Sequence, residues 1–301
     1  MNAWRPALTL VKILGLAVAL MVSSGIGSTL LPASATAPTG EEGAAGAPSG
    51  GFLALVAALM LAQTIALALP VLAARWHGWR LVGAVFLLHF GTVTFLSQVE
   101  TLVYLGDRLG GEMVGGLFLM GLFTAALFAP LPVLVLGRWR PSPEAPDRPP
   151  ATSLDGWPWK SAVGGLLFVA LYYLFGYYVA WRTPEVREFY GGTDPGSFLA
   201  QMASVMEGTP WMLPFQLARG LLWVALAVLA MRMMRGPLWR VALSVSILFG
   251  VPALYLLLPN PLMPDPVRMA HLLETAPCQF LFGALVVFLF RRRTAGSIGD
   301  G

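Results

Sequence analysis

The sequence is poor in charged residues and in cysteine. Asp, Glu, Lys and Arg together make up 11% of its 301 residues, whereas a soluble domain typically carries about 25%. Its one cysteine, Cys278, cannot form an intramolecular disulfide, so cysteine usage gives no indication of redox compartment. A phosphate-binding loop, a dinucleotide fingerprint, a nucleophile elbow and a CxxC pair are also missing. No motif therefore names a reaction, and the low charge argues against a soluble globular domain.

Long apolar runs take the place of the missing charge. Hydrophobic residues make up 57% of the chain, and the mean hydropathy is +0.72. A membrane-spanning helix needs about 20 mostly apolar residues. The sequence therefore predicts an all-α, polytopic integral membrane protein, a single membrane domain built as a bundle of about eight transmembrane helices with short loops. The eight predicted spans are residues 7–31, 52–74, 81–105, 113–136, 161–181, 211–231, 238–258 and 267–290.

Basic residues recur in every second connection between these spans. The bases lie near residues 75–80, 138–160, 232–240 and 291–293, whereas residues 41–42, 107–112 and 185–207 are net acidic. By the positive-inside rule, this alternation places both termini in the cytoplasm. The same distribution explains the net charge of +4 and argues against a nucleic-acid partner. Short loops favour a bacterial-type plasma (inner) membrane.

Two connections are long enough to have a structure of their own. The Pro-rich residues 138–160 predict a cytoplasmic linker between two four-span halves, which show no internal repeat. Residues 182–210 predict an extracytoplasmic helical connector. Thr183-Pro184-Glu185 is typical of a helix start, Gly191-Gly192 would end that helix, and helical spacing returns over residues 197–207. This connector is either a packed surface element or a lid over an outward-facing cavity.

The first span has an alternative interpretation. Arg5, Lys12, an apolar core and the small residues 33–37 resemble a signal peptide with an A-x-A cleavage site. However, the apolar run is about 19 residues, longer than the usual 7–15 of a signal-peptide core. Cleavage would leave seven spans.

Polar side chains predicted to lie in the outer half of the membrane define the candidate site. Ionisable residues inside a span are costly and are a functional-site hypothesis by default. The candidates for substrate binding or proton handling are Glu100, Gln216, Arg219, His271 and Glu274.

Arg219 has the strongest need for a partner because its guanidinium stays charged. By helix rise, it lies about 12 Å below the outer surface and Glu274 about 10 Å below it. We therefore expect a contact between Arg219 and Glu274, with Glu100 as the second choice. This pair either fixes helix packing or belongs to a functional site, and Arg219 could instead extend to the outer interface.

Two of the three histidines, His89 and His271, lie in predicted spans. His271 lies three residues before Glu274, so the two could form a carboxylate–imidazole pair that relays protons. No metal-binding spacing occurs, so we predict no metal site. His89 lies about 13 Å or more from His271 in depth, which excludes bis-histidine haem, and no cofactor is predicted. His89 is expected to be a core histidine bonded to a hydroxyl or carbonyl.

Three functions fit these features. A transporter or permease with an outward-facing polar site is favoured narrowly. The alternatives are a structural or assembly subunit and a membrane-embedded enzyme with Glu274 as general base, acting on a lipid or peptide. A non-enzymatic function is favoured over an enzymatic one. The predicted partners are the lipid bilayer and a small-molecule or lipid ligand.

Overall fold

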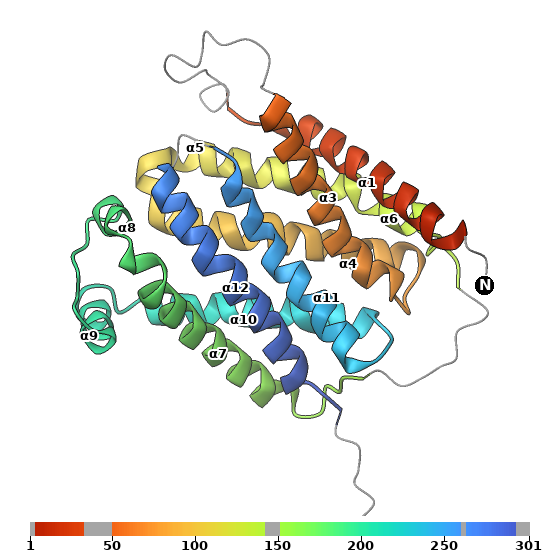
Figure 1. Cartoon of the computed structure of the whole chain (residues 1–301). Coiled ribbons are helices and arrows are strands. Elements are labelled where there is room, and N and C mark those ends of the chain that lie inside the picture. The colour runs from red at the N-terminus through yellow and green to blue at the C-terminus, as the bar shows by residue number, and fades with distance from the viewer. Residues whose placement is uncertain (1–3, 33–49, 142–150, 260–262, 293–301) are drawn as a thin grey trace, which may run out of the picture.

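The computed structural model describes residues 4–32, 50–141, 151–259 and 263–292. Within these residues every regular element is helical (Figure 1). The longer α-helices are α1 (Trp4–Ser28), α3 (Gly50–Leu72), α4 (Gly78–His89), α5 (Leu96–Phe128), α7 (Trp157–Tyr178), α10 (Met212–Met233), α11 (Leu238–Gly250) and α12 (Asp265–Leu289). The shorter elements are the π-helix η2 (Phe90–Phe95), α6 (Pro130–Val135), the 3₁₀-helix η3 (Ala180–Arg182), α8 (Pro184–Phe189), α9 (Phe198–Gly208) and the 3₁₀-helix η4 (Val251–Leu257).

Seven helical stretches of the described residues are long and apolar enough to cross a membrane. The all-α prediction is thus confirmed, and the seven apolar stretches support a multi-pass membrane protein. Several predicted features lie outside the described residues. They are most of the linker between the first two spans, with the small residues 33–37, and the stretches 142–150 and 293–301.

The longest of the seven stretches, Gly78–Val135, has 58 residues and turns back on itself at Gly110 (Figure 1). Gly110 has φ 77° and ψ 152°, a conformation that glycine adopts at little cost. The two arms touch, because a Cβ added to Gly121 would lie 2.0 Å from Oγ1 of Thr94. In a straight helix these residues would be about 40 Å apart. One glycine therefore makes the reversal where the sequence suggested a loop between residues 105 and 113.

One end of the bundle carries the basic loops, and we call it the arginine end. Its loops are bonded together: the Arg75 amide donates to the Met233 carbonyl at 2.7 Å and the Arg235 amide to the Ala73 carbonyl at 2.8 Å. The bases at or near this end are Arg75, Arg80, Arg138, Arg140, Lys160, Arg232, Arg235, Arg240, Arg291 and Arg292. The opposite end carries α8, α9 and the Gly110 turn, and we call it the connector end (Figure 1).

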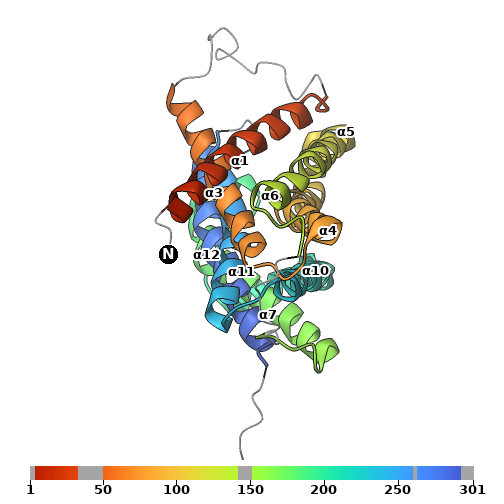
Figure 2. The same cartoon turned by 90° about the vertical axis from the view of Figure 1, so that its right-hand side faces the viewer.

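Helix α1 packs antiparallel to the second arm of the hairpin. Gly27 faces Thr124, and a Cβ there would lie 2.5 Å from the Thr124 Oγ1. Leu16 and Leu20 are buried in the common core. In the rotated view, α5 and α6 lie on one side of the bundle and α11 and α12 on the other (Figure 2). Helix α1 therefore also runs from the arginine end to the connector end.

The span predicted at residues 238–258 consists of two kinds of helix. The α-helical part ends at Gly250, and a 3₁₀-helix continues from Val251 to Leu257. Pro252 near this junction has no amide hydrogen to donate to the carbonyl four residues earlier. The α-helical hydrogen-bond ladder is therefore interrupted where the 3₁₀-helix begins.

Candidate functional site at the connector end

The five candidate residues lie on three helices and form two hydrogen-bonded groups. Glu100 comes from α5, Gln216 and Arg219 from α10, and His271 and Glu274 from α12. The first group contains Arg219, Glu100 and Gln216, and the second contains His271 and Glu274.

Arg219 forms a bidentate ion pair with Glu100. Its Nη1 donates to the Glu100 Oε1 at 3.0 Å and its Nη2 to the Oε2 at 2.6 Å. The Nη1 also donates to the Oε1 of Gln216, one turn earlier, at 2.7 Å. The Arg219 side chain is 5% exposed, whereas that of Glu100 is 36% exposed. Parallel charge-assisted bonds of this kind are strong and fix the orientation of the guanidinium.

The expected contact between Arg219 and Glu274 is therefore wrong, and the second choice, Glu100, is the partner. Side chains on an α-helix lean toward its N-terminus. Both α10 and α12 begin at the connector end, so both side chains extend toward that end from their backbone level. Arg219 pairs with Glu100 of α5, and Glu274 with His271 one turn earlier on its own helix. Matching backbone depths therefore does not identify which helices face each other.

Two tyrosines that were not among the five candidate residues extend the first group. The Nε2 of Gln216 donates to the Tyr104 hydroxyl at 2.9 Å, and the hydroxyls of Tyr104 and Tyr172 lie 3.0 Å apart. These bonds connect α10, α5 and α7. The spacing of Tyr104, four residues after Glu100, is a signal that could have identified it.

The second group is a chain of three side chains, which we call the relay: Tyr190, His271 and Glu274. The Nδ1 of His271 lies 2.8 Å from the Oε2 of Glu274, and its Nε2 lies 3.1 Å from the Tyr190 hydroxyl. The side chains of His271 and Glu274 are 21% and 11% exposed. Gly176 of α7 leaves room for the carboxylate, because a Cβ there would lie 3.4 Å from the Glu274 Oε1.

Tyr190 belongs to the connector, immediately after α8, and was not predicted to join the site. Burial raises the pKa of its hydroxyl, and the negative charges of Glu100 and Glu274 raise it further, whereas Arg108 lowers it. Tyr190 therefore keeps its proton and can donate it to the Nε2 of a neutral His271. The Nδ1–H then donates to Glu274, which is the tautomer that this arrangement selects.

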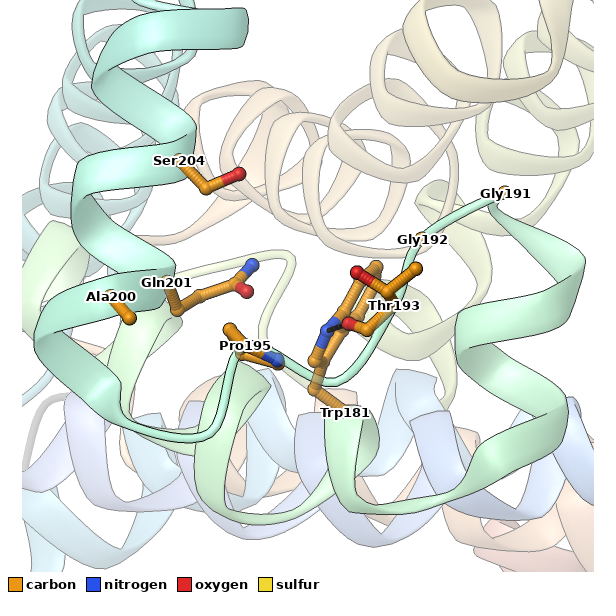
Figure 3. A pocket seen from close by; sticks show the side chains of 8 residues that line it. All are labelled: Trp181, Gly191, Gly192, Thr193, Pro195, Ala200, Gln201 and Ser204. Atoms are coloured by element: carbon orange, nitrogen blue, oxygen red, sulfur yellow. Dashed lines mark hydrogen bonds between the residues drawn. The ribbon is translucent and has the colours of Figure 1, made fainter.

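A pocket of about 370 Å³ lies in the connector beside the relay (Figure 3). Trp181, Gly192 and Thr193 line one side of it, and Gln201 and Ser204 of α9 line the other. Gly192 packs closely on the indole, since a Cβ there would lie 2.5 Å from the Trp181 Cζ2. The Trp181 ring also stacks on Tyr190, with centroids 6.5 Å apart and an interplanar angle of 23°. The pocket therefore adjoins the first residue of the relay.

His89 is a buried core histidine, as predicted. It is 3% exposed and packs edge-on against Phe128, with ring centroids 5.6 Å apart. Its Nδ1 has no hydrogen-bond partner among the described residues.

In comparisons with protein-family models, curated proteins and solved structures, nothing matches this chain. Within the described residues, no group of three or more His, Cys, Asp or Glu side chains could hold a metal ion.

Proposed function

We propose that this protein is a proton-coupled transporter whose proton-handling group is the pair formed by His271 and Glu274. The observation that carries the proposal is the relay itself. It is a continuous hydrogen-bonded chain from a connector tyrosine to a carboxylate that is 11% exposed and lies inside a helix bundle. Titratable groups arranged in this way inside membrane proteins typically mark proton pathways.

The orientation follows from the arginine end. With bases gathered at one end of the bundle, the positive-inside rule places that end in the cytoplasm and the relay on the outer side. In this proposal the hairpin at Gly110 makes two passes, so that the seven apolar stretches form eight spans and both termini lie in the cytoplasm. We place the protein in a bacterial plasma membrane, with the connector pocket as the first binding site for a small-molecule substrate.

The two hydrogen-bonded groups have different roles in this proposal. The guanidinium of Arg219 is neutralised by Glu100 and held by Gln216, so it is poorly placed to bind an anionic substrate. We assign this group to helix packing, because it joins α5 to α10. The relay contains no permanent cation, so His271 and Glu274 can gain and lose protons.

The alternative of a membrane-embedded enzyme has one feature in its favour. A carboxylate, an imidazole and a hydroxyl in sequence is the arrangement that activates a nucleophile. However, the pKa of Tyr190 is raised by its burial and by the two nearby carboxylates, so its nucleophilic phenolate is disfavoured. The arrangement suits proton donation better than covalent catalysis.

The test is proton entry into lipid vesicles that contain the purified protein and a trapped pH-sensitive dye. An inward proton gradient is imposed with potassium and valinomycin present to prevent charge build-up. We expect protein-dependent acidification that is lost in Glu274→Gln and retained in Glu188→Gln, an exposed carboxylate of α8. Infrared spectra recorded during pH titration should show a carboxylic acid band that is absent from Glu274→Gln. Equal proton entry in all three proteins, or no titrating band, would overturn the proposal.

A further inference from the structure

Three buried polar atoms lie about one to two and a half helical turns closer to the arginine end than Arg219 and Glu274. They are the Nε1 of Trp223 on α10, the Oγ of Ser246 on α11 and the Oε1 of Gln279 on α12. The three residues are 5%, 1% and 7% exposed. None of these atoms has a hydrogen-bond partner among the described residues. Most buried polar atoms in proteins do have one, so each of these calls for an explanation.

Side-chain and backbone contacts connect the three residues. The Trp223 ring contacts the Phe249 ring, with centroids 4.7 Å apart, and Phe249 lies one turn after Ser246 on α11. The backbone of Ser246 faces Gly283, where an added Cβ would lie 2.8 Å from the Ser246 Cα. Gln279 lies one turn before Gly283 on the same face of α12. The three polar atoms therefore come from neighbouring helices and lie within about one helical turn of one another in depth.

A fourth helix contributes at the same level. Gln63 of α3 is 0% exposed, and neither its Nε2 nor its Oε1 has a partner among the described residues. Helix α3 packs against α11. Gln63 and Trp223 lie about 14 and 15 Å from the last residues of their helices. Those ends are joined by the bridge between Ala74 and Met234.

We propose that Gln63, Trp223, Ser246 and Gln279 line a second site, which binds water and small uncharged hydrogen-bonding solutes. Together they offer an indole donor, a hydroxyl and two amides, and a buried water typically makes about three hydrogen bonds to such groups. The four side chains carry no charge, so the site has nothing to neutralise an ion at this depth. It begins about 6–8 Å beyond Arg219 and Glu274 along their helices. The role of this site as the inner half of a transport route rests on the proposed function. The hydration of the site is independent of that function.

The experiment measures how fast a cysteine in this layer reacts with a small water-soluble methanethiosulfonate reagent. In a Cys278→Ala background, Ser246→Cys and Gln279→Cys are placed in the site. Leu248→Cys is the control, because it is on α11, 0% exposed and turned away from Ser246. A thiol reacts as the thiolate, which needs water, so we expect Ser246→Cys and Gln279→Cys to react at least about tenfold faster than Leu248→Cys. Thermal unfolding checks that each variant is folded. If either Ser246→Cys or Gln279→Cys does not fold, the other is used for the test.

Reaction of both site cysteines at the rate of Leu248→Cys would overturn the proposal. Its outcome is separate from that of the vesicle assay. Fast thiol reaction with no Glu274-dependent proton entry would keep the hydrated site and reject the transport route. Proton entry with unreactive thiols would keep the transporter and reject this site.

Discussion

The guanidinium of Arg219 and the carboxylate of Glu100 meet through two parallel hydrogen bonds of 3.0 and 2.6 Å. The pair is asymmetric, because the arginine side chain is 5% exposed and the glutamate side chain 36% exposed. The cation is therefore the buried partner and depends on the carboxylate for its neutralisation. The pair therefore links α5 to α10. We assign Arg219 to helix packing, whereas His271 and Glu274 of the relay lie on α12.

Removing either member of this pair should destabilise the protein. Breaking a buried ion pair typically costs about 3–5 kcal/mol, and the exposure of Glu100 lowers the expected loss to about 1–3 kcal/mol. Glu100→Gln should lower the thermal midpoint, and adding Arg219→Gln should recover part of the loss. The measurement is a double-mutant cycle on purified protein. The matched cycle of Arg219→Gln with Glu274→Gln should be close to additive. Coupling of Arg219 to Glu274 without coupling to Glu100 would contradict the assignment of Glu100 as the partner.

Stability at alkaline pH should depend on Tyr190. Burial and two carboxylates raise its pKa above the ordinary value of 10.0, so the folded state holds this proton more tightly than the unfolded state. The resulting stabilisation is complete below pH 10 and is lost as the pH rises from 10 toward the folded-state pKa. Tyr190→Phe should lose about 0.5–1.5 kcal/mol at neutral pH, for one hydrogen bond, and show a flatter decline above pH 10. Unfolding measured from pH 8 to 11 checks this, with the exposed Tyr178→Phe as control. Parallel curves for the wild type and Tyr190→Phe would be evidence against the raised pKa.

The fold class could be predicted because it depends on composition. A long apolar run inside a membrane must satisfy the hydrogen bonds of its own backbone, and a single continuous run does so as an α-helix. The candidate residues could be identified for a related reason, since Arg219 and Glu274 are rare and costly at such depths.

The partners of those residues could not be predicted in the same way. Sequence gives the level of an α-carbon but not which helices face each other. Arg219 meets Glu100 of α5, whereas Glu274 pairs with His271 on its own helix. Tyr190 joined the site from a connector whose position over α12 is a tertiary feature. The absence of a partner for the His89 Nδ1 among the described residues likewise depends on which side chains, such as Phe128, pack around it.

The reversal at Gly110 can be tested by replacing one glycine. Gly110→Ala should destabilise by about 1–3 kcal/mol, because its φ of 77° is strained for any residue with a Cβ. No atom lies within 4 Å of the added Cβ, so the effect is one of backbone conformation alone. Gly111→Ala is the matched control, because it also has open space but no positive φ. Thermal unfolding of the two variants should separate them, and equal midpoints would argue against the hairpin.

Labelling in intact cells tests the orientation and, with it, the outward position of the relay. In a Cys278→Ala background, Ser204→Cys lies in the exposed connector and Arg140→Cys at the exposed arginine end. The positive-inside rule predicts that a membrane-impermeant maleimide labels Ser204→Cys in intact cells and labels Arg140→Cys only after the membrane is opened. Labelling of both after permeabilisation shows that each thiol is accessible. The reverse pattern would place the relay in the cytoplasm, where Tyr190 would exchange protons with the cell interior and the proposed direction of proton entry would be inverted.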